Sequence, residues 1–330
     1  MTNEVLDSAL YVVTHAQDVT IKEEGIRSSA AFIHMSMMEK AYSHETWSSH
    51  ALHPKTKSKE TLYFIFFLDL MNFSFWSDSE KFTVRCGGQL WTGYWSLCAL
   101  IHRAKDENFP LLDPPWWGVA SDVDLRHCFR GETTCQIPLL DERIQILRES
   151  SALLASHYDG SVERLIECAE YSARRLVCQL VSIFPSFRDS HQYHGRTIKL
   201  YKRAQILVAD LWACFGGSSY GKFDDIDEIT MFADYRVPQI LHGLDCLAYS
   251  DRLLHTLRNG IEIACGSDEE IEVRACSIWA VELICREIRL ISRTAFNAIL
   301  VDFYLWDLAK AREKEGAISI PCHKTRCIFY

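Results

Sequence analysis

Apolar side chains recur at helical spacing over most of the chain. Residues 141–157 and 161–183 place apolar residues three and four positions apart with charged residues between them, and residues 198–214 continue the pattern. A glycine pair beginning at Gly216 follows where that third helix would end. Residues 270–300 carry the longest run of this kind. The sequence therefore predicts a mainly α protein with a helical body.

Two segments depart from the helical pattern. Residues 82–94 alternate around Gly87 and Gly88, which is typical of a short β-hairpin with a glycine turn. Residues 105–122 hold three of the eight prolines, which predicts a loop. No repeat or long linker divides the chain, so we expect a single domain. Its expected parts are residues 1–60 without a firm assignment, residues 61–125 as a mixed part with the hairpin, and residues 126–330 as the helical body.

The composition is that of a folded globular protein. Of 330 residues, 48% are hydrophobic and 24% are charged, which argues against a disordered chain. The net charge is 35 − 44 = −9, and an acidic chain is a poor general binder of DNA or RNA because such binding needs a basic surface. The longest apolar run, residues 62–68, is far shorter than the ~20 residues that a membrane span needs.

The thirteen cysteines do not resemble a disulfide framework. Their number is odd, no CxxC pair occurs, and Cys168, Cys178, Cys276 and Cys285 lie within helix-like apolar stripes. Zinc binding is the alternative for the Cys and His content, but the missing CxxC pair disfavours it. Residues 1–20 contain three acidic residues and no secretory pattern. We expect reduced, mostly buried thiols in a cytoplasmic or nuclear protein that is not secreted.

Asp234 is the first candidate functional residue. It lies between Phe232 and Tyr235, directly before Arg236 and a helix that Pro238 would start and that would run to about residue 249. A carboxylate on a loop at a helix start can be held in fixed geometry while it stays accessible to a ligand. The structural alternative is an ion pair between Asp234 and Arg236.

Glu282 is the second candidate. On a helix it shares a stripe with Ile278 and Cys285, and a carboxylate among apolar neighbours must be paired or have a raised pKa. The alternative is a structural ion pair with Arg274 or Arg286, each about one or two turns away.

Two segments interleave aromatic rings with acids or amides. VDFYLWD (301–307) contains Asp302 and Asp307, and LMNFSFWSD (70–78) contains Asn72 and Asp78. Rings that alternate with hydrogen-bonding groups are suited to a planar heterocycle. The same pattern also occurs in ordinary cores, where a buried Trp or Tyr needs a polar partner.

Basic residues gather at two places. Each group could hold a single phosphate, although a solvated face is the other interpretation. The common nucleotide, hydrolase and zinc-protease motifs GxxxxGK[ST], GxGxxG, GxSxG and HExxH are absent. The two groups are Lys199, Lys202 and Arg203 and, near the end of the chain, His323, Lys324 and Arg326.

Seven segments, collinear from about residue 62 onward, form a recognisable set: LMNFSFWSD (70–78), GYWSLCALIHRA (93–104), YKRAQILVADLW (201–212), ITMFADYRVPQIL (229–241), EVRACSIWAVELI (272–284), VDFYLWD (301–307) and PCHKTRCIFY (321–330). FADYRVPQ and FYLWD are the most specific of these motifs. Together the segments resemble the queuosine salvage family, the queuosine 5′-phosphate N-glycosylases. The first ~45 residues match least clearly, and WSSHALHP (47–54) matches more loosely than the later segments.

The resemblance implies a mostly helical fold similar to that of DNA glycosylases. It also implies hydrolysis of the N-glycosidic bond of queuosine 5′-monophosphate, which releases queuine and ribose 5-phosphate for salvage toward tRNA modification. The partner would be this small molecule, with no cofactor, metal, membrane or direct nucleic-acid contact. The acidic charge fits, because a mononucleotide needs one phosphate site and a duplex needs a basic track. A non-enzymatic carrier of queuine is the alternative function, and a helical interaction scaffold is a third.

The resemblance also assigns roles to residues. Asp234 matches the family's catalytic aspartate, and a carboxylate near the sugar stabilises the positive charge that develops as the bond breaks. The residues expected to contact the base or its side group are His50, Phe232, Asp302 and Asp307, and those expected to shape the pocket are Asn72, Phe75 and Trp76. Tyr235 and Arg236 would bind substrate, and Glu282 would support the site as a second carboxylate. The phosphate candidates are Lys202 and Arg203, with His323 and Arg326 in reserve.

Overall fold

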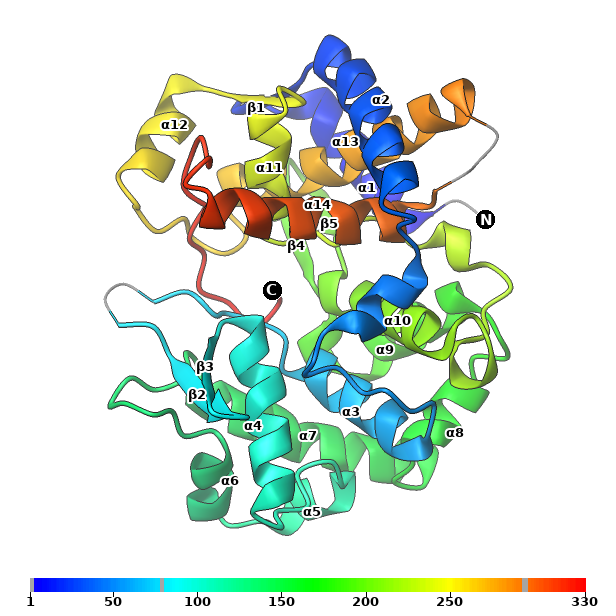
Figure 1. Ribbon diagram of the computed structural model, residues 1–330, viewed down its shortest axis with the longest axis vertical. Coiled ribbons are helices and arrows are strands. Elements are labelled where there is room, and N and C mark those ends of the chain that lie inside the picture. Colours follow the sequence, from blue (N-terminus) through cyan, green and yellow to red (C-terminus); the bar gives the residue numbers. More distant parts are fainter. Residues whose placement is uncertain (1–2, 78–79, 293–295) are drawn as a thin grey trace.

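The computed structural model describes residues 3–77, 80–292 and 296–330, and helices are its main elements. Within these ranges the strands form three two-stranded antiparallel sheets. The prediction of a mainly α protein with a small hairpin is confirmed. Figure 1 shows two groups of helices, one above the other, with the C-terminal segment running between them.

The lower group comes from the middle of the chain (Figure 1). Its helices are α3 (Lys59–Leu70), α4 (Tyr94–Asp106), α5 (Pro114–Val119), α6 (Asp122–Cys128), α7 (Leu140–Tyr158), α8 (Val162–Glu167), α9 (Ala173–Ile183) and α10 (Lys202–Phe215), with short 3₁₀ helices η2 (Pro185–Phe187), η3 (Ser219–Gly221) and η4 (Ile226–Glu228). Helix α3 packs against α4, α8 and α10, and α5 packs against α7. Trp117 and Phe66 stack with ring centroids 6.4 Å apart, so α3 and α5 share an aromatic core.

The upper group joins both ends of the chain. Its elements are α1 (Glu4–His15), β1 (Val19–Ile21), α2 (Glu23–Glu39), α11 (Val237–Gly243), β6 (Leu247–Tyr249), α12 (Asp251–Arg258), α13 (Asp268–Ile291) and α14 (Ala298–Lys314). Helix α13 contacts α1 and α2 on the N-terminal side and α11 and α14 on the C-terminal side. Strands β1 and β6 pair antiparallel with Thr20 opposite Ala248. A 3₁₀ helix, η1 (His44–Ser49), leads from α2 into the lower group.

The other two strand pairs are hairpins, and each has glycine at its turn. The predicted hairpin is present as β2 (Thr83–Cys86) and β3 (Gln89–Thr92), and both turn glycines, Gly87 and Gly88, have positive φ. A second hairpin, β4 (Ser190–Tyr193) with β5 (Arg196–Lys199), turns at His194 and Gly195 and occupies the start of the helix predicted from residue 198. Helix α10 therefore begins only at Lys202.

Local backbone breaks changed the length of several predicted helices. The predicted helix over 161–183 is two helices, α8 and α9, because Glu170 and Tyr171 have φ values of 49° and 62°. The helix predicted to reach residue 249 ends at Gly243 and gives way to strand β6. The predicted loop 105–122 contains α5, since its prolines occupy the first turn, where a missing N–H costs nothing.

All thirteen cysteines are free, and Cys276 and Cys285 are buried as expected. Cys168 and Cys178 are exposed instead, and Cys178 lies on the side of α9 away from its buried residues, which include Leu176 and Leu180. Across the described ranges, no helix has both the length and the apolar character that crossing a membrane requires.

Candidate active site

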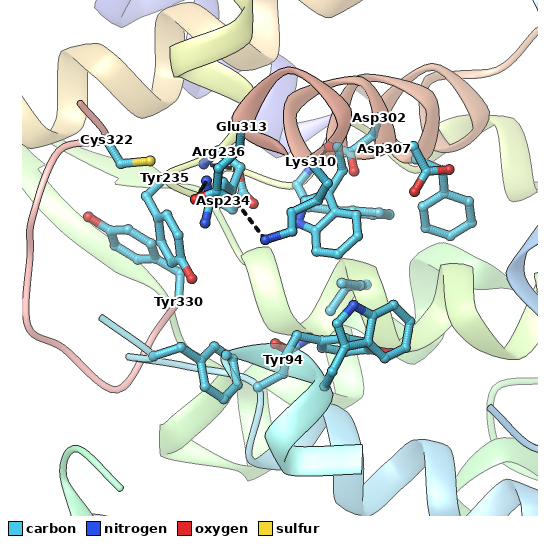
Figure 2. A pocket seen from close by; sticks show the side chains of 18 of the residues that line it. Tyr94, Asp234, Tyr235, Arg236, Asp302, Asp307, Lys310, Glu313, Cys322 and Tyr330 are labelled. Carbon is cyan, nitrogen blue, oxygen red and sulfur yellow. Dashed lines mark hydrogen bonds and ion pairs between the residues drawn. The ribbon is translucent and has the colours of Figure 1, made fainter. Parts of the chain in front are cut away.

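A cavity of about 990 Å³ lies between the two groups of helices. Its upper wall comes from α14, the segment 232–239 and residues 321–324; its lower wall comes from η1, the segment after α3, and helices α4 and α10. Figure 2 shows Asp302 and Asp307 on α14 facing the cavity, with Tyr94 of α4 on the other side. The volume lies at the upper end of the ~300–1,000 Å³ typical of small-molecule sites.

Asp234 is fixed in the upper wall by its own backbone surroundings. Its Oδ1 atom accepts hydrogen bonds from the N–H groups of Arg236 and Val237, at 2.9 and 2.8 Å, directly before α11. Burial raises the pKa of Asp234, while Lys202 and these two amides act in the opposite direction. The bonds hold one oxygen in place and leave Oδ2 for a ligand in the cavity.

Arg236 does not pair with Asp234 through its side chain. Its Nη1 atom lies 3.0 Å from Oε1 of Glu313, and Lys310 lies 2.7 Å from Oε2 of the same residue. All four residues line the cavity and gather in Figure 2. Asp234 therefore accepts a hydrogen bond from the backbone of Arg236 but forms no ion pair with its side chain. The carboxylate of Asp234 remains part of the cavity lining.

Lys202 enters the cavity from the first turn of α10. With Ile206 and Asp210 it forms a stripe at four-residue spacing, which puts all three on one helix face. Its side chain is buried; burial lowers the pKa of Lys202, and the charges of Asp234 and Asp69 oppose that shift. Lys202 is thus a buried side chain whose charge interacts with Asp234 in the upper wall and with the buried Asp69, which does not line the cavity.

Asp302 and Asp307 are held differently on α14. Oδ1 of Asp302 accepts the N–H of Phe232 at 3.1 Å, and burial and then the charge of Asp234 raise the pKa of Asp302 well above its usual value. Asp307 accepts the Tyr42 hydroxyl at 2.7 Å, and burial raises its pKa. Asp302 is therefore the carboxyl group in the cavity that favours its protonated form beside Asp234.

Two further carboxyl groups, Asp69 and Asp210, interact with Lys202, and of the two only Asp210 lines the cavity. Asp69 is fully buried, accepts a bond from Asn72 at 3.3 Å, and its Oδ2 atom has no hydrogen-bond partner among the described residues. Burial raises the pKa of Asp69 to about 7. Asp210 lines the cavity; burial and the nearby Asp69 raise its pKa well above the usual value. At both groups, burial therefore favours the protonated form.

The lower wall is a set of stacked rings. His50 lies on Trp95 with centroids 3.4 Å apart and planes 17° apart, and Trp47 stacks on His53 at 3.9 Å. His53 Nδ1 donates to the Trp47 carbonyl at 2.6 Å, and its Nε2 accepts the Tyr94 hydroxyl at 2.7 Å. Burial lowers the pKa of His53 to about 3, so it is neutral at pH 7. These contacts fix the ring planes in the part of the lower wall formed by η1 and α4, beside Lys202 and Asp210 of α10.

The structure brings most of the predicted residues together. Asn72, Phe75 and Trp76 follow α3 into the cavity, and Tyr235 lines it beside Asp234. Asp78 lies outside the described residues. The predicted residues that line the cavity are His50, Asn72, Phe75, Trp76, Lys202, Phe232, Asp234, Tyr235, Arg236, Asp302, Asp307 and His323.

Three residues to which the resemblance assigns a role do not line the cavity, and neither does Lys199 of the first basic group, which pairs with Glu4 at 2.8 Å. Glu282 pairs with Arg286 at 2.8 Å and Arg289 at 3.6 Å, which is the structural alternative for this carboxylate. Arg203 is buried and donates to the backbone carbonyls of Asp69, Leu70 and Ser186. Arg326 stacks on Trp76, with its guanidinium 3.9 Å from the ring centroid. Each group is occupied by a structural partner.

Several residues that line the cavity were not predicted from the sequence. Tyr94 and Trp95 lie within the segment GYWSLCALIHRA, yet only the adjoining hairpin turns this end of α4 toward the cavity. Asp210 could have been found from its spacing of eight residues from Lys202 on one helix. The other lining residues not anticipated are Trp47, His53, Lys310, Glu313, Cys322 and Tyr330, among others from distant segments.

Known proteins and a family model match this chain over most or all of its length. Residues 52–330 match the family model described as "Queuosine salvage protein". A relative from Nematostella vectensis is 42% identical, with all of both chains covered; one from Schizosaccharomyces pombe is 42% identical, covering 99% of this chain and 100% of the relative. One from Sphaerobacter thermophilus is 39% identical over 99% of this chain and 97% of its own. Each of these relatives is called "Queuosine 5'-phosphate N-glycosylase/hydrolase".

Proposed function

The chain belongs to the queuosine salvage protein family, and from this premise we propose that it is an N-glycosylase that hydrolyses queuosine 5′-phosphate. The products are queuine and ribose 5-phosphate, and queuine is then available for tRNA modification. The observation that carries the proposal is Asp234, a half-buried carboxylate that lines a nucleotide-sized cavity and has one oxygen fixed by two amides.

Asp234 is the proposed catalytic carboxylate. As the bond between the sugar and the base breaks, positive charge develops on C1′ and the ring oxygen, and a fixed carboxylate beside them stabilises that charge. The two amides and Lys202 favour the ionised form against the effect of burial. Water then supplies the hydroxyl at C1′, either by direct attack or after transient bonding to Asp234.

Asp302 is the proposed hydrogen-bond donor to the leaving base. A 7-deazapurine has no N7 to protonate, so the electron pair that leaves with the base must be stabilised through other atoms. Burial and the charge of Asp234 raise the pKa of Asp302 and so favour the protonated form that can donate this bond. A neutral carboxyl beside an ionised one is the usual division between acid and base at one site.

The remaining parts of the substrate fit the two walls. The rings of Trp95 and His50 offer flat surfaces to the base, and aromatic stacking tolerates its planar shape. Asp307 suits the secondary amine or the diol of the queuine side group. Lys202 and His323 stay candidates for the 5′-phosphate, and Arg236 and Lys310 lie beside them in the cavity lining.

The first test is turnover by the purified protein with queuosine 5′-phosphate, with free queuine detected by mass spectrometry, beside Asp234→Asn. We expect release by the wild type only, with queuine binding retained in the variant. If both proteins bind queuine and neither releases it, the carrier function replaces the enzyme. Equal release by both proteins would overturn the role of Asp234.

A further inference from the structure

Behind the cavity, one buried arginine joins elements that carry the site. Arg274 of α13 is fully buried and does not line the cavity. Its Nη1 atom donates to Asp189 at 3.1 Å and Glu270 at 3.0 Å, and Nη2 donates to Asp189 at 2.6 Å. Both acids are also buried, so the charge of the guanidinium is compensated by two buried carboxylates.

The first link runs to the proposed catalytic residue. Nε of Arg274 donates to the Ala233 carbonyl at 2.9 Å, and this carbonyl belongs to the peptide that leads into Asp234. On the other side, Asp234 is held by the amides of Arg236 and Val237. Arg274 therefore anchors the near end of the loop whose far end is fixed by α11.

The second link runs to Lys202. Oδ2 of Asp189, which Arg274 holds in a two-pronged contact, also accepts the backbone N–H of Lys202 at 3.1 Å. The Asp189 carbonyl accepts the N–H groups of Leu200 and Tyr201. Burial opposes ionisation of Asp189, yet Arg274 and His191 hold its pKa well below the usual value. A lasting anion thus fixes the first turn of α10, from which Lys202 extends.

The third link runs to the C-terminal segment. The guanidinium carbon of Arg274 lies 3.9 Å from the ring centroid of Tyr330, and the Tyr330 carbonyl accepts the N–H of Ser74 at 2.8 Å. The Tyr330 hydroxyl lies 3.1 Å from Nε2 of His323, and both residues line the cavity. Arg274 therefore contacts the ring of Tyr330 and the backbone carbonyl that precedes Asp234 directly, and it reaches the backbone of Lys202 through Asp189.

We propose that Arg274 is a positioning residue of the proposed glycosylase, which keeps Asp234 and Lys202 in register from behind the cavity. The inference rests on the proposed function. The planar guanidinium serves an acid pair, a carbonyl and a ring at once, which a lysine ammonium cannot reproduce. Reactive groups must be held within about 0.5 Å of the productive geometry, and a shift of about 1 Å costs on the order of 100-fold in rate.

Arg274→Lys is the decisive variant, because it keeps the charge and removes the fork. We expect kcat for queuosine 5′-phosphate to fall by roughly 10- to 100-fold. The dissociation constant for free queuine should stay within about two-fold, since α4, η1 and α14 hold the ring-binding surface without Arg274. A purely structural role would lower the melting temperature but would leave kcat per folded molecule unchanged.

Glu272→Gln is the matched control on the same helix. Glu272 is equally buried, and its carboxylate accepts bonds from the backbone of Gln17, Asp18 and Val19 and from the Tyr193 hydroxyl. None of these partners lines the cavity. We expect Glu272→Gln to lower the melting temperature and to leave kcat within about two-fold.

Asp189→Asn is the second variant if Arg274→Lys does not fold, and it should show the same separation between kcat and queuine affinity. Wild-type kcat in a folded Arg274→Lys or Asp189→Asn protein would overturn the positioning role while the proposed function stands. A loss of queuine affinity in proportion to kcat would also overturn it. A wild-type protein without turnover would overturn the proposed function, and the positioning role with it.

Discussion

The two walls of the cavity are built on different principles. In the upper wall, Asp234, Asp302 and Lys310 are charged or titratable groups held by backbone amides or by one another. Most of the lower wall, apart from Lys202 and Asp210 of α10, consists of rings such as His50 and Trp95 that are held by stacking and by neutral hydrogen bonds. Changes in the upper wall should therefore act on the reaction step, and changes in the lower wall on substrate binding.

The largest effect should come from Asp234. Asp234→Asn keeps the shape and removes the charge that stabilises the developing cation, so we expect kcat to fall by roughly 10³-fold or more. Queuine binding by calorimetry should change little, because the free base carries no sugar cation. If the queuine-release measurement gave a kcat within ten-fold of the wild type, the assignment of the reaction step to the upper wall would be wrong.

Asp302 should follow, with a distinct dependence on pH. Its raised pKa favours the protonated carboxyl, and as the pH rises through that pKa the proton is lost and kcat of the wild type should fall. Asp302→Asn should lower kcat by about 100-fold and remove this alkaline decline, since an amide does not titrate. The check is a pH–kcat profile of both proteins, with Asp307→Asn as the same-helix control that retains the decline.

The lower wall should respond in the opposite way. Trp95→Leu removes the ring that stacks on His50, and we expect KM and the queuine dissociation constant to rise by about 10-fold, given that stacking on a base contributes roughly 1–3 kcal/mol. The value of kcat should stay within about three-fold. A fall in kcat with unchanged queuine affinity would mean that the two walls are not divided as described.

Asp69, behind both walls, should affect stability and its pH dependence. The folded protein keeps the Asp69 proton up to a pKa of about 7, whereas the unfolded chain loses it near the usual value. This group's contribution to stability is present at low pH and is lost as the pH rises toward 7, by a few kcal/mol at most, since one pKa unit corresponds to about 1.4 kcal/mol. Asp69→Asn should therefore gain in melting temperature relative to the wild type between pH 5 and pH 8. A constant difference across that range would contradict the shift.

The smallest effect should come from Glu282. It pairs with Arg286 outside the cavity, and an ion pair near the surface contributes about 0–1 kcal/mol. Glu282→Gln should leave kcat and KM unchanged and shift the free energy of unfolding by no more than that amount, as measured by urea denaturation. A marked loss of kcat would mean that Glu282 contributes to the reaction after all.

The reach of the sequence can be judged from particular residues. The turn glycines Gly87 and Gly88 identified the first hairpin, because positive φ at both positions is a local requirement. The backbone break at Glu170 and Tyr171 left no comparable signal, since neither residue favours positive φ. Among site residues, Asp234 stood out through its place before Pro238, while Glu282 showed the same polar-in-apolar pattern without being near the cavity.

The sequence by itself determined the helical class, the first hairpin and the motifs around Asp234 and Asp302, because helix periodicity, turn chemistry and motif spacing are properties of neighbouring residues. Only the tertiary structure decided which charges share a cavity. The sequence offers Arg203 as a phosphate ligand and Arg274 as a partner for Glu282, yet both are buried, and they bond to the backbone or to an acid far along the chain. Burial and long-range pairing depend on how helices pack, and local spacing carries no information about that.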